Sequence, residues 1–189
     1  MPRSRVPGLE NYDRRVAERL LEIESTPTGR PLVAWVRRHQ PRIVLGRPLT
    51  GGGFTYPWPL SRIVISPHGD DDWLRGALVH ELTHLIRYGG PGSLFASVEQ
   101  ERVCAWTTAR VWTEYPPNDP TPAAMRHNYH EQAGWVLDQP PEAARRTIRT
   151  TWGQFYRRLP ELQPGPWPWQ QLAGGWRQII DGVRLLFGR

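Results

Sequence analysis

The sequence predicts an α+β fold in which a small twisted sheet precedes two long helices and a further helical layer follows them. The prediction rests on the order of three kinds of segment. Short segments of strand character lie close together between residues 42 and 66, and helical periodicity follows from residue 70 to residue 115. The rest of the chain is again helical, with breaks marked by proline, and the predicted helices are Thr121–Asp138, Glu142–Leu159 and Trp169–Phe187.

The composition favours one domain. The chain has 189 residues and is 39% hydrophobic, which is enough for one substantial core. We therefore expect a single domain over residues 1–189. It divides into helices and a small sheet (1–67), the two long helices (68–115) and a helical extension (116–189).

The chain has a net charge of +6, and all of its positive side chains are arginines because it contains no lysine. A basic chain favours an acidic partner such as nucleic acid. The arginines are dispersed, however, with only short pairs such as Arg14-Arg15 and Arg157-Arg158 and no polybasic block. Nucleic-acid binding is therefore kept as an alternative.

The N-terminal part predicts two helices and then strands. Tyr12–Glu24 has the apolar spacing of an amphipathic helix, and Pro31–Gln40 reads as a second, shorter one. Strand character follows in three segments, which are Arg42–Gly46, Gly52–Tyr56 and Arg62–Ser66. Pro57 and Pro59 follow the middle segment, and proline is tolerated in a sheet only near an edge, so this strand should lie at an edge.

The next helix carries the most informative motif. Three aspartates at 70–72 offer a cap and first-turn negative charge, and Gly89 marks the end. Within this helix the segment V-H-E-L-T-H-L-I-R contains His80 and His84, four residues apart, with Glu81 beside the first. Residues with this spacing project from one face of a helix, so both imidazoles can bind one metal ion.

The chemistry of this H-E-x-x-H pattern suits a catalytic Zn²⁺ site. Two neutral imidazoles supply two ligands, a third protein ligand completes the set, and one position stays open for water. Zinc lowers the pKa of that water, and Glu81 can accept its proton as general base. The pattern also occurs by chance, and a histidine can instead lie in the core with its ring hydrogen-bonded to a backbone carbonyl. The core stripe, however, is formed by Leu74, Leu78, Val79, Leu82, Leu85 and Ile86, and the histidines lie opposite it.

Glu101 is the candidate third ligand. It lies in a predicted helix from Ser93 to Tyr115, in the middle of an otherwise mainly apolar arc that includes Cys104. A lone carboxylate is costly to bury unless it is paired or binds a metal. An ion pair with an arginine elsewhere is the alternative. Glu99 lies on the opposite side, near Arg110, and is expected to be a solvated charge.

These residues resemble the gluzincin branch of the zincin metallopeptidases, in which H-E-x-x-H is followed by a glutamate on a second helix. The short chain looks closest to the minigluzincins. The resemblance covers about residues 42–115 and implies a zincin-like fold, with His80, His84 and Glu101 as zinc ligands and Glu81 as general base. One difference is Ala105, which stands where thermolysin-like enzymes carry an aspartate. The metzincin branch is excluded because Arg87 replaces its glycine and no third histidine follows.

Other polar residues are weaker candidates. His68 precedes the metal helix and is a rival to Glu101. A zinc peptidase also needs a donor to the oxyanion, and His127, Tyr129, His130 and Tyr156 are possible. In zincins a strand beside the cleft pairs with extended substrate, and residues 51–56 are the candidate here, with a flexible hairpin as the alternative.

We therefore expect a cytoplasmic zinc metallopeptidase that acts on a peptide or protein substrate. A single cysteine, Cys104, cannot form an intrachain disulfide, which suits a reducing compartment; it is expected to be a small packing residue, with contact to the metal as the alternative. No stretch has the length of a membrane span. The competing classes are a nucleic-acid-associated protein with a zincin core and a non-catalytic interaction protein with a structural or vestigial zinc.

Overall fold

The computed structural model describes residues 4–48, 53–56, 60–89, 96–115, 136–152 and 154–160. Within these ranges the chain combines helices with one three-stranded sheet, which confirms the α+β class. The helices are α1 (Arg14–Glu24), α2 (Gly29–His39), α3 (Asp71–Tyr88), α4 (Val98–Thr113), α6 (Pro141–Thr151) and α7 (Gln154–Arg158). The strands are β1 (Arg42–Leu45), β2 (Gly53–Tyr56) and β3 (Arg62–Ile65).

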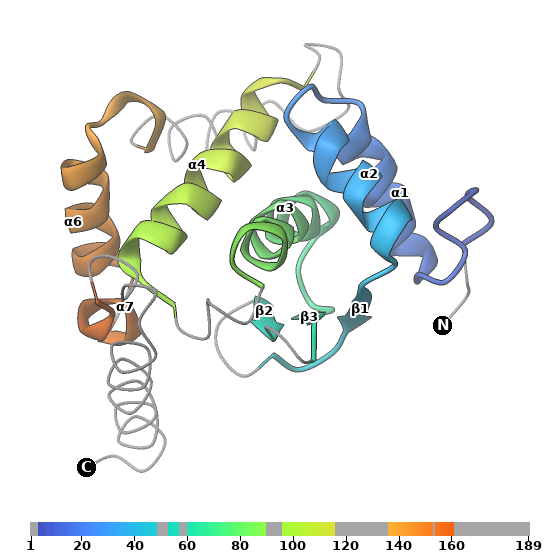
Figure 1. Cartoon of the computed structure of the whole chain (residues 1–189), viewed down its shortest axis with the longest axis horizontal. Helices are drawn as coiled ribbons and strands as arrows, with labels where there is room; N and C mark the ends of the chain where they lie inside the picture. Colours follow the sequence, from blue (N-terminus) through green and yellow to red (C-terminus); the bar gives the residue numbers. More distant parts are fainter. Residues whose placement is uncertain are drawn as a thin grey trace.

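Helix α3 occupies the centre of the molecule. Figure 1 shows it between the α1–α2 pair and α4, with the sheet below it and with α6 and α7 on the far side of α4. It packs on α1, α2 and α4 and on strands β2 and β3. The N-terminal helices, the sheet and α4 therefore all contact the helix that carries the H-E-x-x-H segment.

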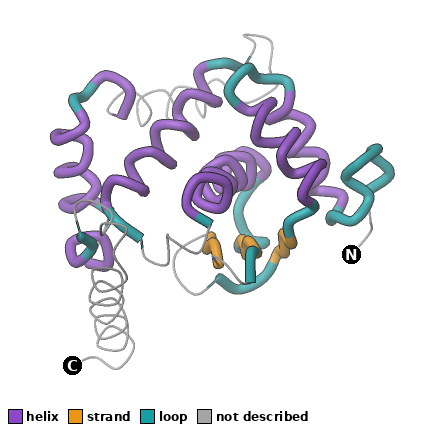
Figure 2. Tube along the Cα trace, in the orientation of Figure 1, coloured by secondary structure: helices purple, strands orange, loops and turns teal. Residues whose placement is uncertain are grey.

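The sheet has the order β1-β3-β2. β3 is parallel to β1 and antiparallel to β2, and the three strands lie in a row beneath α3 (Figure 2). Ile63 and Ile65 on the central strand are completely buried, whereas all four residues of β2 are half-buried. The middle predicted strand is thus an edge strand, as the prolines after it indicated.

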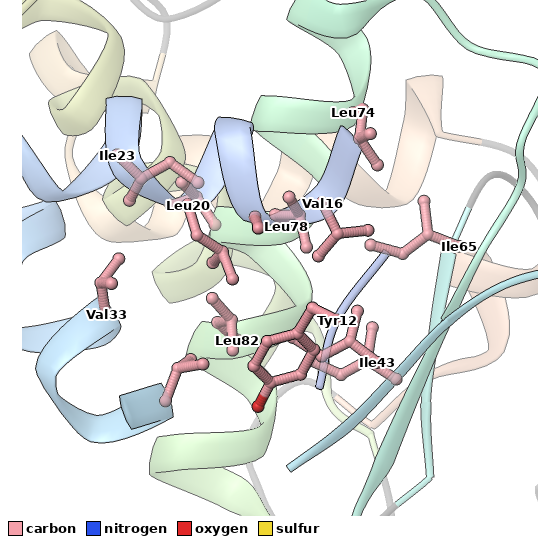
Figure 3. Close-up of a cluster of buried hydrophobic side chains, with 14 of the residues drawn as sticks. Tyr12, Val16, Leu20, Ile23, Val33, Ile43, Ile65, Leu74, Leu78 and Leu82 are labelled. Atoms are coloured by element: carbon pink, nitrogen blue, oxygen red, sulfur yellow. The ribbon is translucent and has the colours of Figure 1, made fainter. Parts of the chain in front are cut away.

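The core lies between α3, the N-terminal helices and the sheet. Figure 3 shows its buried side chains, which come from α1, α2, α3, β1 and β3 and from Tyr12 just before α1. The stripe predicted for the metal helix contributes Leu74, Leu78, Val79, Leu82 and Leu85, all buried. Full burial of one such side chain is worth about 1.5–3 kcal/mol, so this stripe holds α3 in a single orientation.

The termini of α3 agree with the sequence. Asp70 caps the helix, since its side chain accepts a hydrogen bond of 2.7 Å from the Trp73 backbone N–H. At the other end the N–H of Gly89 donates to the Leu85 carbonyl. These caps and the buried stripe position the face that carries His80 and His84.

Two predicted helices differ from the structure. The long helix expected from Ser93 begins at Val98, because Ser97 caps it by accepting from the Gln100 N–H. The single helix predicted for Glu142–Leu159 is wrong: α6 ends at Thr151, and α7 starts at Gln154. The sequence has a glycine between them, which is a poor helix former.

Some predicted elements lie outside the described residues. These include most of Thr121–Asp138 and the whole of Trp169–Phe187. Across the parts of the chain that the structure describes, no helix has both the length and the apolar character that crossing a membrane requires.

Candidate metal centre

The two histidines of α3 point toward α4. His80 and His84 lie one helical turn apart, and their rings meet edge to face with centroids 5.0 Å apart. Both side chains are mostly shielded from solvent, with 19% and 13% exposed. They share one face, as the spacing predicted.

Glu101 comes from the first turn of α4 and meets both imidazoles. Its Oε2 lies 3.2 Å from Nε2 of His80, and its Oε1 lies 3.4 Å from Nε2 of His84. The side chain is 8% exposed. The carboxylate therefore divides its two oxygens between the histidines, and among the described residues it forms no ion pair with an arginine, which was the alternative. The predicted burial of this arc is also correct for Val98, Cys104, Ala105 and Trp112.

The charges of the three side chains are coupled. Burial would raise the pKa of the Glu101 carboxyl, but the imidazoles of His84 and His80 outweigh this and hold that pKa well below its usual range. Burial likewise opposes protonation of His84, yet Cys104 and Glu101 raise the pKa of His84 well above its ordinary value. The site therefore favours an ionised carboxylate without help from a permanent cation.

These donors fit a zinc ion. Nitrogen and oxygen ligands that lie about 2.1 Å from zinc at a tetrahedral angle are separated by about 3.4 Å. The observed separations of 3.2 and 3.4 Å are close to this value. They also suit imidazole–carboxylate hydrogen bonds in the metal-free protein. The donor set of two imidazoles and one carboxylate is one that zinc prefers in catalytic sites.

Glu81 lies beside this group and is held by β2. Its side chain is buried, and its Oε2 accepts a hydrogen bond of 2.7 Å from the Thr55 hydroxyl. A methyl group placed on Gly53 would lie 2.8 Å from the other carboxylate oxygen. The edge strand thus passes directly against the carboxylate of Glu81, and a larger residue at position 53 would displace this side chain.

Cys104, which the sequence predicted to be mainly a packing residue, lies beside the two histidines. It is completely buried one turn after Glu101 on α4. Its Sγ and one ligand nitrogen from each of His80 and His84 all lie within 4.8 Å of one another. Burial raises the pKa of the thiol to about 11. Its i+3 spacing from Glu101 was the signal that could have identified it.

Aromatic side chains at the C-terminal end of α6 and in α7 lie near His80. The Trp152 ring lies 6.2 Å from the His80 ring and 5.3 Å from the Tyr156 ring, measured between centroids. Burial raises the pKa of Tyr156, and the negative charges of Glu101 and Glu81 add to this effect. Of the suggested oxyanion donors, only Tyr156 is described near the site. His127, Tyr129 and His130 lie outside the described residues.

The structure also shows where His68 and Glu99 lie. His68 is exposed at the turn before α3 and does not belong to the histidine group. Glu99 is not a solvated charge near Arg110, and that expectation is wrong. Its carboxylate pairs with Arg102 at 2.6 Å and with Arg145 of α6 at 2.9 Å, because α6 packs against this side of α4.

Comparison with known proteins adds no relative. No model of a protein family matches the chain, and neither a curated protein nor a solved structure matches it.

Proposed function

We propose that the chain is a zinc-dependent metallopeptidase of the gluzincin type. In this proposal His80, His84 and Glu101 hold Zn²⁺ and Glu81 is the general base. The observation that supports it most is the contact of one buried carboxylate from α4 with both imidazoles of the H-E-x-x-H segment. A structural ion pair would not require a second acid, Glu81, beside the same histidines.

Bound zinc would act as a Lewis acid on water and on the peptide carbonyl. Glu81 accepts the proton of the attacking water and delivers it to the amine nitrogen as the peptide bond breaks. The Thr55 hydroxyl orients the Glu81 carboxylate for both transfers. Tyr156 is the described side chain best suited to donate a hydrogen bond to the developing oxyanion.

An extended peptide is the substrate that suits the edge strand. In the part of the chain that the structure describes, β2 pairs with β3 alone, so its other edge can accept a peptide strand. Because β2 also contacts Glu81 through Gly53 and Thr55, a peptide paired with this strand would run past the general base. A reducing compartment such as the cytoplasm suits the free thiol of Cys104.

The alternative of nucleic-acid binding has less support. It rests on the net charge of +6, and many described arginines are already engaged with carboxylates. Examples are Arg37 with Glu24, Arg15 with Asp71 and Arg102 with Glu99. Salt-dependent binding of DNA or RNA by the purified chain would favour this alternative.

The decisive experiment pairs metal analysis with peptide hydrolysis. We expect about one zinc per chain in the wild type and in Glu81→Gln, and loss of zinc in His80→Ala and Glu101→Ala. Glu81→Gln should lower hydrolysis of a peptide library by about 10²–10⁴-fold, because it removes the general base and leaves the ligands intact. Unchanged hydrolysis in Glu81→Gln refutes the peptidase. Zinc retention without hydrolysis in any protein favours a non-catalytic interaction protein.

A further inference from the structure

The side chain of Cys104 is placed to bind the same metal as the histidines. It lies on α4 three residues after Glu101, and both side chains are buried on the face that meets α3. The ligand atoms of His80, His84 and Cys104 lie within 4.8 Å of one another. α3 thus contributes two nitrogen donors one turn apart, and α4 contributes an oxygen donor and a sulfur donor one turn apart.

The distances require little movement for a four-ligand site. With Zn–S near 2.3 Å and Zn–N near 2.1 Å, sulfur and nitrogen at a tetrahedral angle are about 3.6 Å apart. Each sulfur–nitrogen separation in the structure is at most 4.8 Å, which is larger than the ideal value by no more than about 1.2 Å. A rotation of the cysteine side chain between rotamers can move the sulfur by this amount.

The charges also balance. A dication bound by one carboxylate and one thiolate forms a neutral group, which lowers the cost of burying each charge. The thiol proton leaves to solvent as the Sγ–metal bond forms, since zinc binds thiolate and not thiol. If Cys104 only filled space in the core, its sulfur would not need to lie close to the ligand nitrogens of two histidines.

We propose that Cys104 is a fourth protein ligand, so that the metal-loaded site holds the cation through His80, His84, Glu101 and the Cys104 thiolate. The inference rests on the metal site of the proposed function and does not depend on hydrolysis. Four protein ligands leave the zinc no open position, so water reaches the metal only while the sulfur is detached, and the loaded wild type hydrolyses peptides more slowly than a chain without this ligand. The sulfur also makes the site selective for zinc and cobalt over manganese and magnesium.

Cobalt substitution tests this directly. Co²⁺ bound by thiolate absorbs in the near ultraviolet through sulfur-to-cobalt charge transfer, while its visible bands report binding whatever the ligands are. The chain has a single cysteine, so a thiolate band identifies Cys104 without ambiguity. We expect the full wild-type chain to show both absorptions, and Cys104→Ser and Cys104→Ala to keep the visible bands and lose the ultraviolet band.

The outcomes separate the two proposals. Visible bands without the ultraviolet band in the wild type overturn the Cys104 ligand and leave the three-ligand site intact. The absence of any cobalt binding overturns the ligand together with the site it extends. An ultraviolet band in the wild type, together with a Cys104→Ala variant that binds zinc and still hydrolyses no peptide, supports the ligand and counts against the peptidase. The spectrum of the wild type is decisive even where a variant folds poorly.

A second measurement uses competition between metals. Cys104→Ser should weaken zinc binding by more than the roughly 10–100-fold that loss of an outer-shell partner costs, and should change manganese binding far less. If zinc and manganese weaken equally, sulfur is not a ligand. Under the proposed function, zinc-loaded Cys104→Ala should also hydrolyse peptides several-fold faster than the wild type, since water then reaches the metal.

Discussion

The Thr55 hydroxyl donates a hydrogen bond of 2.7 Å to Oε2 of Glu81, and Oγ1 of Thr55 also lies 3.0 Å from the backbone carbonyl oxygen of Glu81. The two residues are far apart in the chain but adjacent in space, because edge strand β2 packs on helix α3. Thr55 therefore limits the orientations open to the Glu81 carboxylate. In the proposed mechanism this makes Thr55 a positioning residue for the general base.

Thr55→Val should lower kcat and leave zinc content unchanged. We expect a loss of about tenfold or more, as part of the roughly 10²–10⁴-fold that a general base supplies. KM should change little, because the hydroxyl contacts Glu81 and not the metal ligands. Steady-state hydrolysis of a fluorogenic peptide measures both constants. Thr55→Ser keeps the hydroxyl and is the matched control; equal kcat in the valine and serine variants would contradict a positioning role.

Zinc should stabilise the folded chain through the three predicted ligands. At a free concentration one hundred times its Kd, zinc should raise the free energy of unfolding by about 2.7 kcal/mol, and a chelator should remove this gain. Thermal unfolding with and without zinc measures the effect. His80→Ala and Glu101→Ala should lose the response.

The control for this prediction is Glu142→Ala. Glu142 is a mostly exposed carboxylate on α6, with 69% of its side chain accessible. This variant should keep the full zinc response. Equal zinc stabilisation of Glu101→Ala and Glu142→Ala would remove Glu101 from the metal site.

Phe54→Pro should impair peptide cleavage without loss of zinc. Phe54 pairs with Val64 in the middle of β2, and proline removes a backbone N–H from this edge strand. If the edge pairs with substrate, kcat/KM for peptides should fall. Phe54→Ala removes the ring but keeps the N–H, so it separates strand pairing from side-chain contact. Full activity in the proline variant would exclude pairing of substrate with β2.

The Glu99 ion pairs should make stability depend on pH. The hydrogen bond from Arg102 is the main cause that lowers the pKa of Glu99, and the hydrogen bond from Arg145 adds to it. Because the folded-state pKa lies below the unfolded value of about 4.3, this stability is present above that pH and is lost as the pH falls through the lowered pKa. Glu99→Gln should therefore cost about 1 kcal/mol near neutral pH.

Denaturant unfolding of both proteins at several pH values checks this prediction. The difference in the free energy of unfolding between the wild type and Glu99→Gln should shrink toward acid pH. Zinc binding should be unchanged, because Glu99 faces α6 and not the histidines. A difference that stays constant from neutral to acid pH would show that the ion pairs do not contribute it.

Much of the fold was predictable from local patterns. The caps at Asp70 and Gly89, the apolar stripe of α3 and the edge position of β2 each follow from neighbouring residues. The burial of Glu101 was also predictable, since it lies in a mainly apolar arc. The break between α6 and α7 was missed because the apolar spacing of the sequence continues across it.

The sequence by itself determined which side chains share a face of each helix, because helical periodicity and capping act over a few residues. Only the tertiary structure decided which faces meet. The packing of α3 on α4 brings Glu101 and Cys104 to the two histidines, and the packing of β2 on α3 brings Thr55 to Glu81. The docking of α6 likewise pairs Glu99 with Arg145 and not with Arg110. These contacts depend on how whole elements pack against one another, which no short stretch of sequence encodes.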